Sequence, residues 1–431
     1  MNRFTIDDLR AALPELDELR PLVDYLVATS VADPERTWSG SSELGTAGDR
    51  LVEPLDLEEA SERLALEVFE HRSRIYGLAA RAIAALTEGD AEAATEALLQ
   101  AASLEAEKGE APRAAAYADA AYRLARDAGD ATLASLTLRR RARHRRAEGR
   151  YEDARRDYEE ALVLAEAAED PRGAAEACVG AGNVCEEQAR WGEAEDWYRR
   201  ALSLLGSHEP PVPEQWHALL NLHVVLRSMG SLEGCLEPLR EAEALVETLD
   251  DSSAVPFLEN AWGQYHMALR DFDTAEQHLR RGVAESADAR SEITIRLNLA
   301  ETLFARGRHL DAAEEARRAE RRAIVSSMPQ KLPEVYRLLG RILADEGILD
   351  AFVLFERALQ IVDARDLPAI ERARTLQAYG EAESSLGDTA TGRELLSEAD
   401  RLYERLGIEH RRDAWSDRYQ GERPISESNQ T

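Results

Sequence analysis

The sequence predicts an all-α protein made of a repeated helix pair, and three observations support this prediction. Apolar and small residues recur at helical spacing, a glycine recurs about every 40 residues, and further small residues stand at fixed distances from that glycine. Residues that return every three or four positions lie on one face of a helix. Glycine tolerates the left-handed conformation that ends a helix, so the repeated unit is helix, turn, helix.

The stretch GRYEDARRDYEEALVLA at 149–165 shows the helical pattern most clearly, and similar stretches follow at 189–205 and 307–323. Its charged residues fall on the opposite side of the helix from its small and apolar residues. This arrangement predicts one solvated face and one buried face. The predicted buried residues are Tyr151, Ala154, Tyr158, Ala161, Leu162 and Ala165.

Fixed positions around the turns predict where the helices cross. Small residues at such positions let neighbouring helices approach closely. Seven residues before each turn stands a mostly small residue, with His223 as an exception. The pattern predicts eight repeats from about residue 90, and a weaker helix pair at 57–88 would be a degenerate first repeat. The turn glycines are Gly109, Gly149, Gly230, Gly307, Gly347 and Gly387, with Ala189 and Arg270 in the two remaining turn positions.

These positions resemble the tetratricopeptide repeat, in which a turn glycine is followed by alanine, an aromatic residue and alanine. The period of about 40 residues is similar to the lengthened repeat of kinesin light chains, Pins-type polarity adaptors and bacterial Rap-like regulators. The resemblance implies a right-handed superhelix, an α-solenoid, of eight or nine repeats whose first helices line a concave groove. The pattern is carried by Ala154, Tyr158 and Ala161, by Ala194, Tyr198 and Ala201, and by Ala351, Phe355 and Ala358.

Composition narrows the class of protein. The chain has 431 residues and a formal net charge of −30, which disfavours nucleic acid and anionic lipid as partners. No stretch has the length and apolar character of a membrane span or a signal peptide. Three cysteines without a CxxC pair predict neither a disulfide framework nor a zinc ribbon. We therefore expect an acidic, soluble, cytoplasmic protein of bacterial origin.

The two ends of the chain differ from the repeats. Residues 1–55 predict short helices followed by a mobile linker rich in serine, glycine and proline. The superhelix is expected over 56–407, with its clear repeats starting at about residue 90. Residues 408–431 predict an end helix and then a disordered tail.

No motif for catalysis, cofactor binding or metal binding stands out. Cys178 and Cys185 lie seven residues apart on one helical face and are expected to be buried thiols. His217 and His223 are six apart, which separates their side chains by most of a turn. The glycines of 179–185 lie mid-helix with no preceding strand, unlike a phosphate-binding loop. The sequence therefore predicts a protein that is not an enzyme and has no cofactor.

The segment LRRRARHRRAEGR at 138–150 is strongly basic in an acidic chain. One interpretation is a solvated helix face whose arginines pair with neighbouring carboxylates. The other is a basic end of a binding groove that receives an acidic peptide. Nucleic acid ranks third, because one short segment would act against the large negative net charge.

The resemblance also implies which residues line the groove. Asn221 and Asn298 match the asparagine position that bonds the backbone of an extended peptide in the longer-repeat adaptors; local capping or bonding between helices is the alternative. Four apolar residues would form an exposed anchor at the centre of the groove, although isolated apolar residues usually belong to the core. The implied groove residues are Arg139, Arg143, Arg146, Asn183, Asn221, Arg227, Phe257, Asn260, Gln264, Met267, Leu297, Asn298, Phe304, Arg337, Arg341 and Arg374, of which Phe257, Met267, Leu297 and Phe304 are the apolar four.

The sequence therefore predicts a non-catalytic scaffold or adaptor that binds a protein or peptide in its groove. A second hypothesis is a regulatory sensor similar to Rap proteins, in which residues 1–55 act as the effector. A third is a subunit that supplies specificity to an enzyme complex. The fold alone does not choose among these hypotheses.

Overall fold

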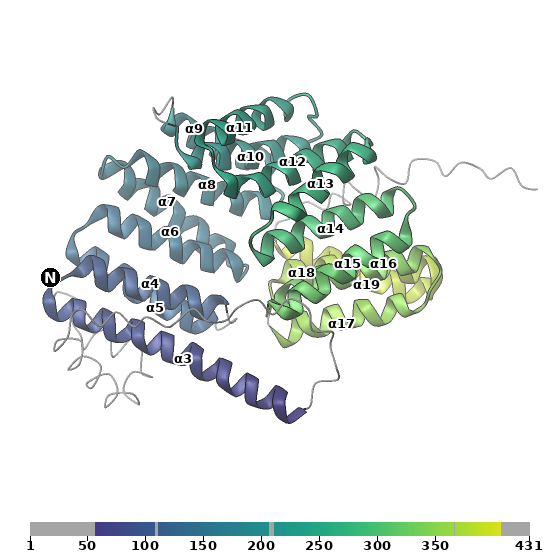
Figure 1. The fold of residues 1–431 in the computed structure, drawn as a ribbon, viewed down its shortest axis with the longest axis horizontal. Helices are drawn as coiled ribbons and strands as arrows, with labels where there is room; N and C mark the ends of the chain where they lie inside the picture. The colour runs from purple at the N-terminus through teal and green to yellow at the C-terminus, as the bar shows by residue number, and fades with distance from the viewer. Residues whose placement is uncertain (1–56, 108–110, 207–210, 327, 366, 407–431) are drawn as a thin grey trace, which may run out of the picture. The chain divides into compact units, whose positions relative to one another are not determined.

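The computed structural model describes residues 57–107, 111–206, 211–326, 328–365 and 367–406 (Figure 1). These residues form two compact units. The first unit contains the described residues up to His144 together with Val163–Glu169, and the second contains Arg145–Leu162 and the described residues from Asp170 onward. The segments predicted for 1–55 and 408–431 lie outside the described residues.

The described residues contain α-helices and two short 3-10 helices and no strand, as predicted. No helix in these ranges combines the length and the apolar character needed to cross a bilayer. The helices are α3 (Leu57–Glu88), α4 (Ala91–Glu107), α5 (Ala111–Ala128), α6 (Ala131–Ala147), α7 (Tyr151–Ala167), α8 (Pro171–Glu187), α9 (Trp191–Leu205), α10 (Pro213–Ser228), α11 (Leu236–Leu249), η2 (Ser252–Ala254), α12 (Val255–Ala268), α13 (Phe272–Glu285), α14 (Ala289–Ala305), α15 (His309–Val325), η3 (Pro329–Lys331), α16 (Leu332–Asp345), α17 (Asp350–Ala364), α18 (Ala369–Leu386) and α19 (Thr389–Leu406).

Residues 57–88 correct one prediction. They form the single helix α3 rather than a degenerate helix pair. The one glycine within α3, Gly77, has no positive φ, and a Cβ added there would meet no atom within 4 Å. It is therefore tolerated inside the helix instead of ending it. The helix ends before Gly89, whose φ of 80° is left-handed, and packs against α4.

The predicted turn positions are confirmed where the structure describes them. Gly149, Gly230, Gly307 and Gly347 all have φ between 73° and 83°. Ala189 and Arg270, which fill the two remaining positions, also adopt positive φ, at 56° and 62°. A left-handed residue other than glycine costs about 1–2 kcal/mol, so packing of the flanking helices imposes this turn. Gly387 differs, with φ of −111°.

Small residues let the helices cross closely. In the second unit, a Cβ built on Gly182 would lie 2.5 Å from Cε1 of Tyr198, and one on Gly340 would lie 2.7 Å from Cζ of Phe355. Contacts of this length are shorter than packed atoms allow, so the rings occupy space that only glycine leaves free. The crossing predicted at each small residue is thus confirmed at these two helix pairs.

His223 occupies the corresponding position of α10 and is fully buried. Its Nδ1 lies 2.8 Å from the carbonyl oxygen of Cys235, at the start of α11. Because a carbonyl only accepts, Nδ1 carries the proton and donates it. His223 therefore ties the two helices of this pair together from inside the core.

The two units have cores of different composition. In the first unit, α3, α4 and α5 bury mostly alanine, with Tyr117, Leu98 and Ile75 among the larger side chains. In the second unit, the cluster that runs from α12 to α17 buries a larger share of leucine and isoleucine, among them Leu279 and Ile293. Each core runs through consecutive helices, as expected when a helix pair buries its apolar face against its neighbours.

The second unit also contains a contact between segments that are distant in sequence. Gly149, in the turn before α7, packs against Pro368 at the start of α18, and a Cβ on Gly149 would lie 3.2 Å from Cβ of Pro368. Tyr151 lies close enough to Glu371 and Arg374 of α18 to interact with their charges. The first and last parts of the second unit therefore meet.

Candidate functional site

A row of polar side chains follows the first helices of successive pairs in the second unit. Each of these helices contacts the next one, from α8 through α10, α12, α14 and α16 to α18. Three of the hydrogen bonds across these contacts join residues that lie 38 positions apart. We call this set the polar row; it consists of Asn183, Asn221, Asn260, Asn298, Arg337 and Thr375.

The four asparagines of the polar row form two bonded pairs. Asn221 Nδ2 donates to Asn183 Oδ1 at 3.2 Å, and Asn298 Nδ2 donates to Asn260 Oδ1 at 2.7 Å. All four side chains are half-buried. A carboxamide has two N–H donors and two acceptor lone pairs, so each pair retains donors and acceptors beyond the bond within it. The asparagines thus bond between helices and still offer groups to a ligand.

The polar row continues with charged residues on α16 and α18. Arg337 Nη1 lies 3.4 Å from Thr375 Oγ1 and 2.6 Å from Glu371 Oε2. Arg374 also bonds Glu371, at 3.1 Å. Burial alone would raise the pKa of Glu371, but the positive charges of Arg337 and Arg374 outweigh it and lower that pKa to about 2. The carboxylate is therefore ionised and held by two arginines.

Further polar contacts in the second unit join these first helices to one another and join α6 to α8. Arg227 is buried and donates to Gln264 at 3.1 Å. Arg341 pairs with Glu301 at 3.7 Å, and Arg146 forms an ion pair with Glu187. Arg227 and Gln264 are both predicted groove residues, whereas Arg341 and Arg146 pair with glutamates outside the predicted set.

Tyr198 of α9 contacts the polar row through its hydroxyl group. Its ring is fully buried over Gly182, and its hydroxyl oxygen lies 2.7 Å from Asn183 Oδ1 and 2.9 Å from Glu186 Oε2. Burial raises the pKa of Tyr198. The phenol is therefore neutral and can donate a hydrogen bond.

Glu186 and Tyr198 were not among the predicted groove residues. Tyr198 was predicted only as the aromatic residue of the repeat. The equivalent residue of a later repeat is Phe355, so the hydroxyl is the one sequence signal that distinguishes the two positions. Nothing in the sequence separates Glu186 from the many other glutamates of this chain.

The predicted apolar anchor needs correction. Met267 and Leu297 are only 1% and 4% exposed, and both belong to the core cluster of the second unit. Phe304 is half-buried beside His309, with ring centroids 5.3 Å apart, while Phe257 is 45% exposed and lies against Trp216. A first helix packs against its pair partner and against neighbouring repeats, so Met267 and Leu297 face those contacts. The four residues do not form one exposed patch.

The basic segment at 138–150 has ion-pair partners along most of its length. In the first unit, Arg141 bonds Asp119 at 2.8 Å; in the second unit, Arg145 bonds Asp157 at 2.7 Å. Arg150 bonds Asp153 at 2.8 Å. These contacts favour the interpretation of a helix face paired with carboxylates. Of the predicted groove residues in the first unit, Arg139 is buried, whereas Arg143 is exposed and has no ion pair with a described residue.

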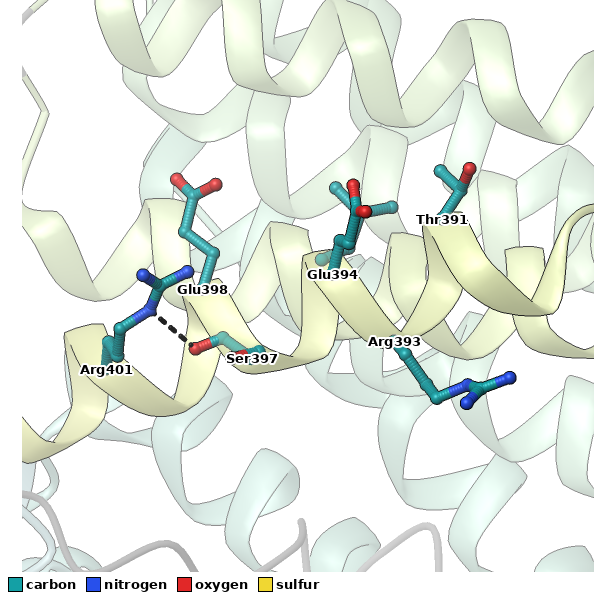
Figure 2. Close-up of a pocket in the computed structure, with 7 residues that line it drawn as sticks. Thr391, Arg393, Glu394, Ser397, Glu398 and Arg401 are labelled. Carbon is teal, nitrogen blue, oxygen red and sulfur yellow. Dashed lines mark hydrogen bonds between the residues drawn. The ribbon is translucent and has the colours of Figure 1, made fainter.

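Reactive side chains are not gathered into a site in the described part of the chain. Cys178, Cys185 and Cys235 are buried free thiols, and burial raises the pKa of Cys185 to about 11. Across these residues no group of three or more histidine, cysteine or acidic side chains has the arrangement of a metal site. A shallow depression of about 500 Å³ lies along α19 (Figure 2). There Arg401 bonds the backbone carbonyl of Ser397, and Arg393 points away from Glu394 and Glu398.

Comparisons with known proteins agree with the repeat pattern. The family model described as "Tetratricopeptide repeat" matches residues 132–207. The helix pairs within these residues match the tetratricopeptide repeat. A search of curated proteins found none that matches the sequence.

Solved structures similar to this chain include two Rap proteins. One is a Rap protein complexed with competence and sporulation factor, at 15% identity and a TM-score of 0.56, covering 80% of this chain and 99% of that chain. Another is the apo form of RapI, at 13% identity and a TM-score of 0.49, covering 63% and 99%. At 15% identity the likeness to the first of these structures concerns the fold alone.

Proposed function

We propose that the second unit binds an extended peptide, or an extended segment of a partner protein, along the polar row. The observation that supports this proposal is the succession of half-buried amide side chains on α8, α10, α12 and α14. A carboxamide presents both a donor and an acceptor, which are the groups that a peptide backbone also presents. The protein would act as a non-catalytic cytoplasmic scaffold or regulator.

The spacing of the row suits an extended chain. Packed helices lie about 8–10 Å apart, and an extended strand rises about 3.3 Å per residue. Successive row positions would therefore meet backbone groups about three residues apart. Side chains of the ligand would alternate between the row and the neighbouring charged contacts, which contain both arginines and glutamates. Acidic ligand segments would find Arg341 and Arg374 near one end.

A regulatory sensor is the second candidate function. One fold neighbour with a TM-score above 0.5 is a Rap protein that was solved with a bound factor. In the present protein the start and the end of the second unit touch at Gly149 and Pro368. A ligand in the row would change how these ends fit together, and residues 1–55 would transmit that change. Removing residues 1–55 would then abolish the cellular output while peptide binding persists.

Peptide selection tests the main proposal. A random peptide display library would be selected on the full-length protein, and the affinity of the best peptide would be measured by calorimetry. We expect Asn221→Ala with Asn298→Ala to weaken binding about tenfold or more, because each lost hydrogen bond contributes about 0.5–1.5 kcal/mol. The control is Arg199→Ala on the exposed side of α9. If the selected peptides bind the double asparagine variant as tightly as they bind the control, the binding site lies elsewhere.

A further inference from the structure

The hydroxyl of Tyr198 has one proton but lies within hydrogen-bond distance of two acceptors. The distances are 2.7 Å to Asn183 Oδ1 and 2.9 Å to Glu186 Oε2. Asn183 Oδ1 also accepts from Asn221 Nδ2, so the oxygen of this carboxamide is the atom that faces the hydroxyl. If Glu186 were ionised, one of the two contacts would join two oxygens with no proton between them.

The surroundings of Glu186 favour the neutral acid. Its side chain is half-buried, and this burial raises its pKa. The charge of Glu187 on the same helix also raises this pKa, whereas the charges of Arg146 of α6 and Arg227 of α10 lower it. Arg146 is ion-paired with Glu187, and Arg227 donates to Gln264. Tyr198 is the hydrogen-bond partner of Glu186 among the described residues.

We propose that Tyr198 and the protonated carboxyl of Glu186 are positioning residues of the polar row, which fix the orientation of Asn183 and make peptide binding depend on pH. The binding part of this proposal rests on the proposed function. The hydrogen-bond network itself does not.

Every proton of the network has a defined place. The carboxyl O–H of Glu186 donates to the oxygen of Tyr198, whose O–H donates to Asn183 Oδ1. Asn221 Nδ2 donates to the same oxygen, so both of its lone pairs are used and Asn183 Nδ2 is left to donate to a ligand carbonyl. When Glu186 releases its proton to solvent, the hydroxyl of Tyr198 turns to the carboxylate. Asn183 then loses one of the two bonds that orient it.

The pair α16–α17 does not have this network. In α16 and α17 the equivalent ring is Phe355, which packs over Gly340 and carries no hydroxyl. The polar row there is held by Arg337 and Glu371 instead. Proton dependence through a tyrosine is therefore expected at α8 and α9 and not at α16 and α17.

The first test needs no ligand. The folded state binds a proton at Glu186 that the unfolded state has lost once pH exceeds the ordinary pKa of glutamate, so stability falls as pH rises through that window. Urea unfolding of the full-length protein at several values between about pH 4 and pH 8 is compared for wild type and Glu186→Gln. The glutamine amide donates to Tyr198 without titrating.

We expect the wild-type midpoint to fall relative to that of Glu186→Gln as pH rises. Glu247→Gln on the exposed side of α11 is the matched control and should track the wild type at every pH. A constant difference between wild type and Glu186→Gln across the range would overturn the proposal, because Glu186 would then have the same pKa in both states.

The second test uses the peptide selected on the full-length protein. We expect the wild type to lose affinity several-fold as Glu186 ionises, Glu186→Gln to keep high affinity at all pH values, and Tyr198→Phe to bind weakly at all of them. Affinity that depends on the asparagines but not on pH would refute the coupling. If no selected peptide responds to the asparagines, the proposed function fails, and the unfolding experiment still decides whether the network exists.

Discussion

The pair α8–α9 and the pair α16–α17 use the same packing in two different ways. In each, an aromatic ring of the second helix lies over a glycine of the first, Tyr198 over Gly182 and Phe355 over Gly340, and both rings are fully buried. Tyr198 extends past the crossing to Asn183, whereas Phe355 stacks on Tyr379 of the next pair with ring centroids 5.4 Å apart. One oxygen atom thus converts a packing residue into part of the candidate site.

The largest expected effect tests whether the two rings are equivalent in packing. We expect Tyr198→Ala and Phe355→Ala each to reduce the free energy of unfolding by about 3–5 kcal/mol, since both leave a large cavity. Urea midpoints provide the measurement, because unfolding of a repeat array need not be two-state. Glu160→Ala on an exposed helix face should be nearly neutral. A much smaller loss at Phe355 would mean that the second crossing collapses around the gap.

The next largest effect is expected at His223, which occupies a helix crossing where other repeats have a small residue. Burial lowers the pKa of His223 from 6.5 to about 4, so the folded state binds fewer protons there than the unfolded state. Stability from this residue is complete above pH 6.5 and is lost as pH falls towards 4, by about 3 kcal/mol in full. The comparison of Glu186→Gln with Glu186→Gln/His223→Leu isolates it, because Glu186 acts in the opposite direction. A pH-independent difference would show that His223 titrates normally.

Filling the space under the rings should have a moderate effect. Gly182→Ala and Gly340→Ala place a methyl group about where the ring atoms lie, and overpacking of this kind costs about 1–3 kcal/mol. The gain in helix propensity of up to about 1 kcal/mol offsets part of this cost. Thermal midpoints of the two variants should fall together. A stabilised Gly340→Ala variant would show that Phe355 moves aside more easily than Tyr198.

The smallest effect isolates the hydroxyl. We expect Tyr198→Phe to lower the free energy of unfolding by about 1 kcal/mol, the usual net contribution of a buried hydrogen bond. Tyr379→Phe is the matched control, since its hydroxyl makes an exposed contact with Glu356 at 3.4 Å. Equal midpoints for both variants would indicate that the Tyr198 hydroxyl contributes no more than an exposed one.

The repeat was predictable because its signals are local. A small residue, a turn position and an aromatic residue at fixed spacing determine a crossing, and the register held even at Ala189 and Arg270, where the turn glycine is missing. Residues 57–88 were misinterpreted because their weak pattern was matched to a later repeat, although no residue between them ends the helix.

The site was harder to predict. A first helix in an array buries two of its faces, and neighbouring positions differ by about 100° around the helix. Periodicity therefore did not distinguish the buried Met267 from the exposed Phe257. The link from Glu186 through Tyr198 to Asn183 joins two helices and depends on which atoms meet. The spacing of residues along the sequence does not predict such a contact.

The contact of Gly149 with Pro368 has a consequence for how this protein can evolve. An open array gains or loses a repeat without disturbing distant parts, because each pair touches only its neighbours. Here a duplicated pair between α8 and α17 would carry Pro368 away from Gly149, and a side chain at Gly149 would meet the proline ring. The number of repeats in the second unit is therefore constrained by its own ends. Its terminal pairs should also resist fraying, because each protects the other.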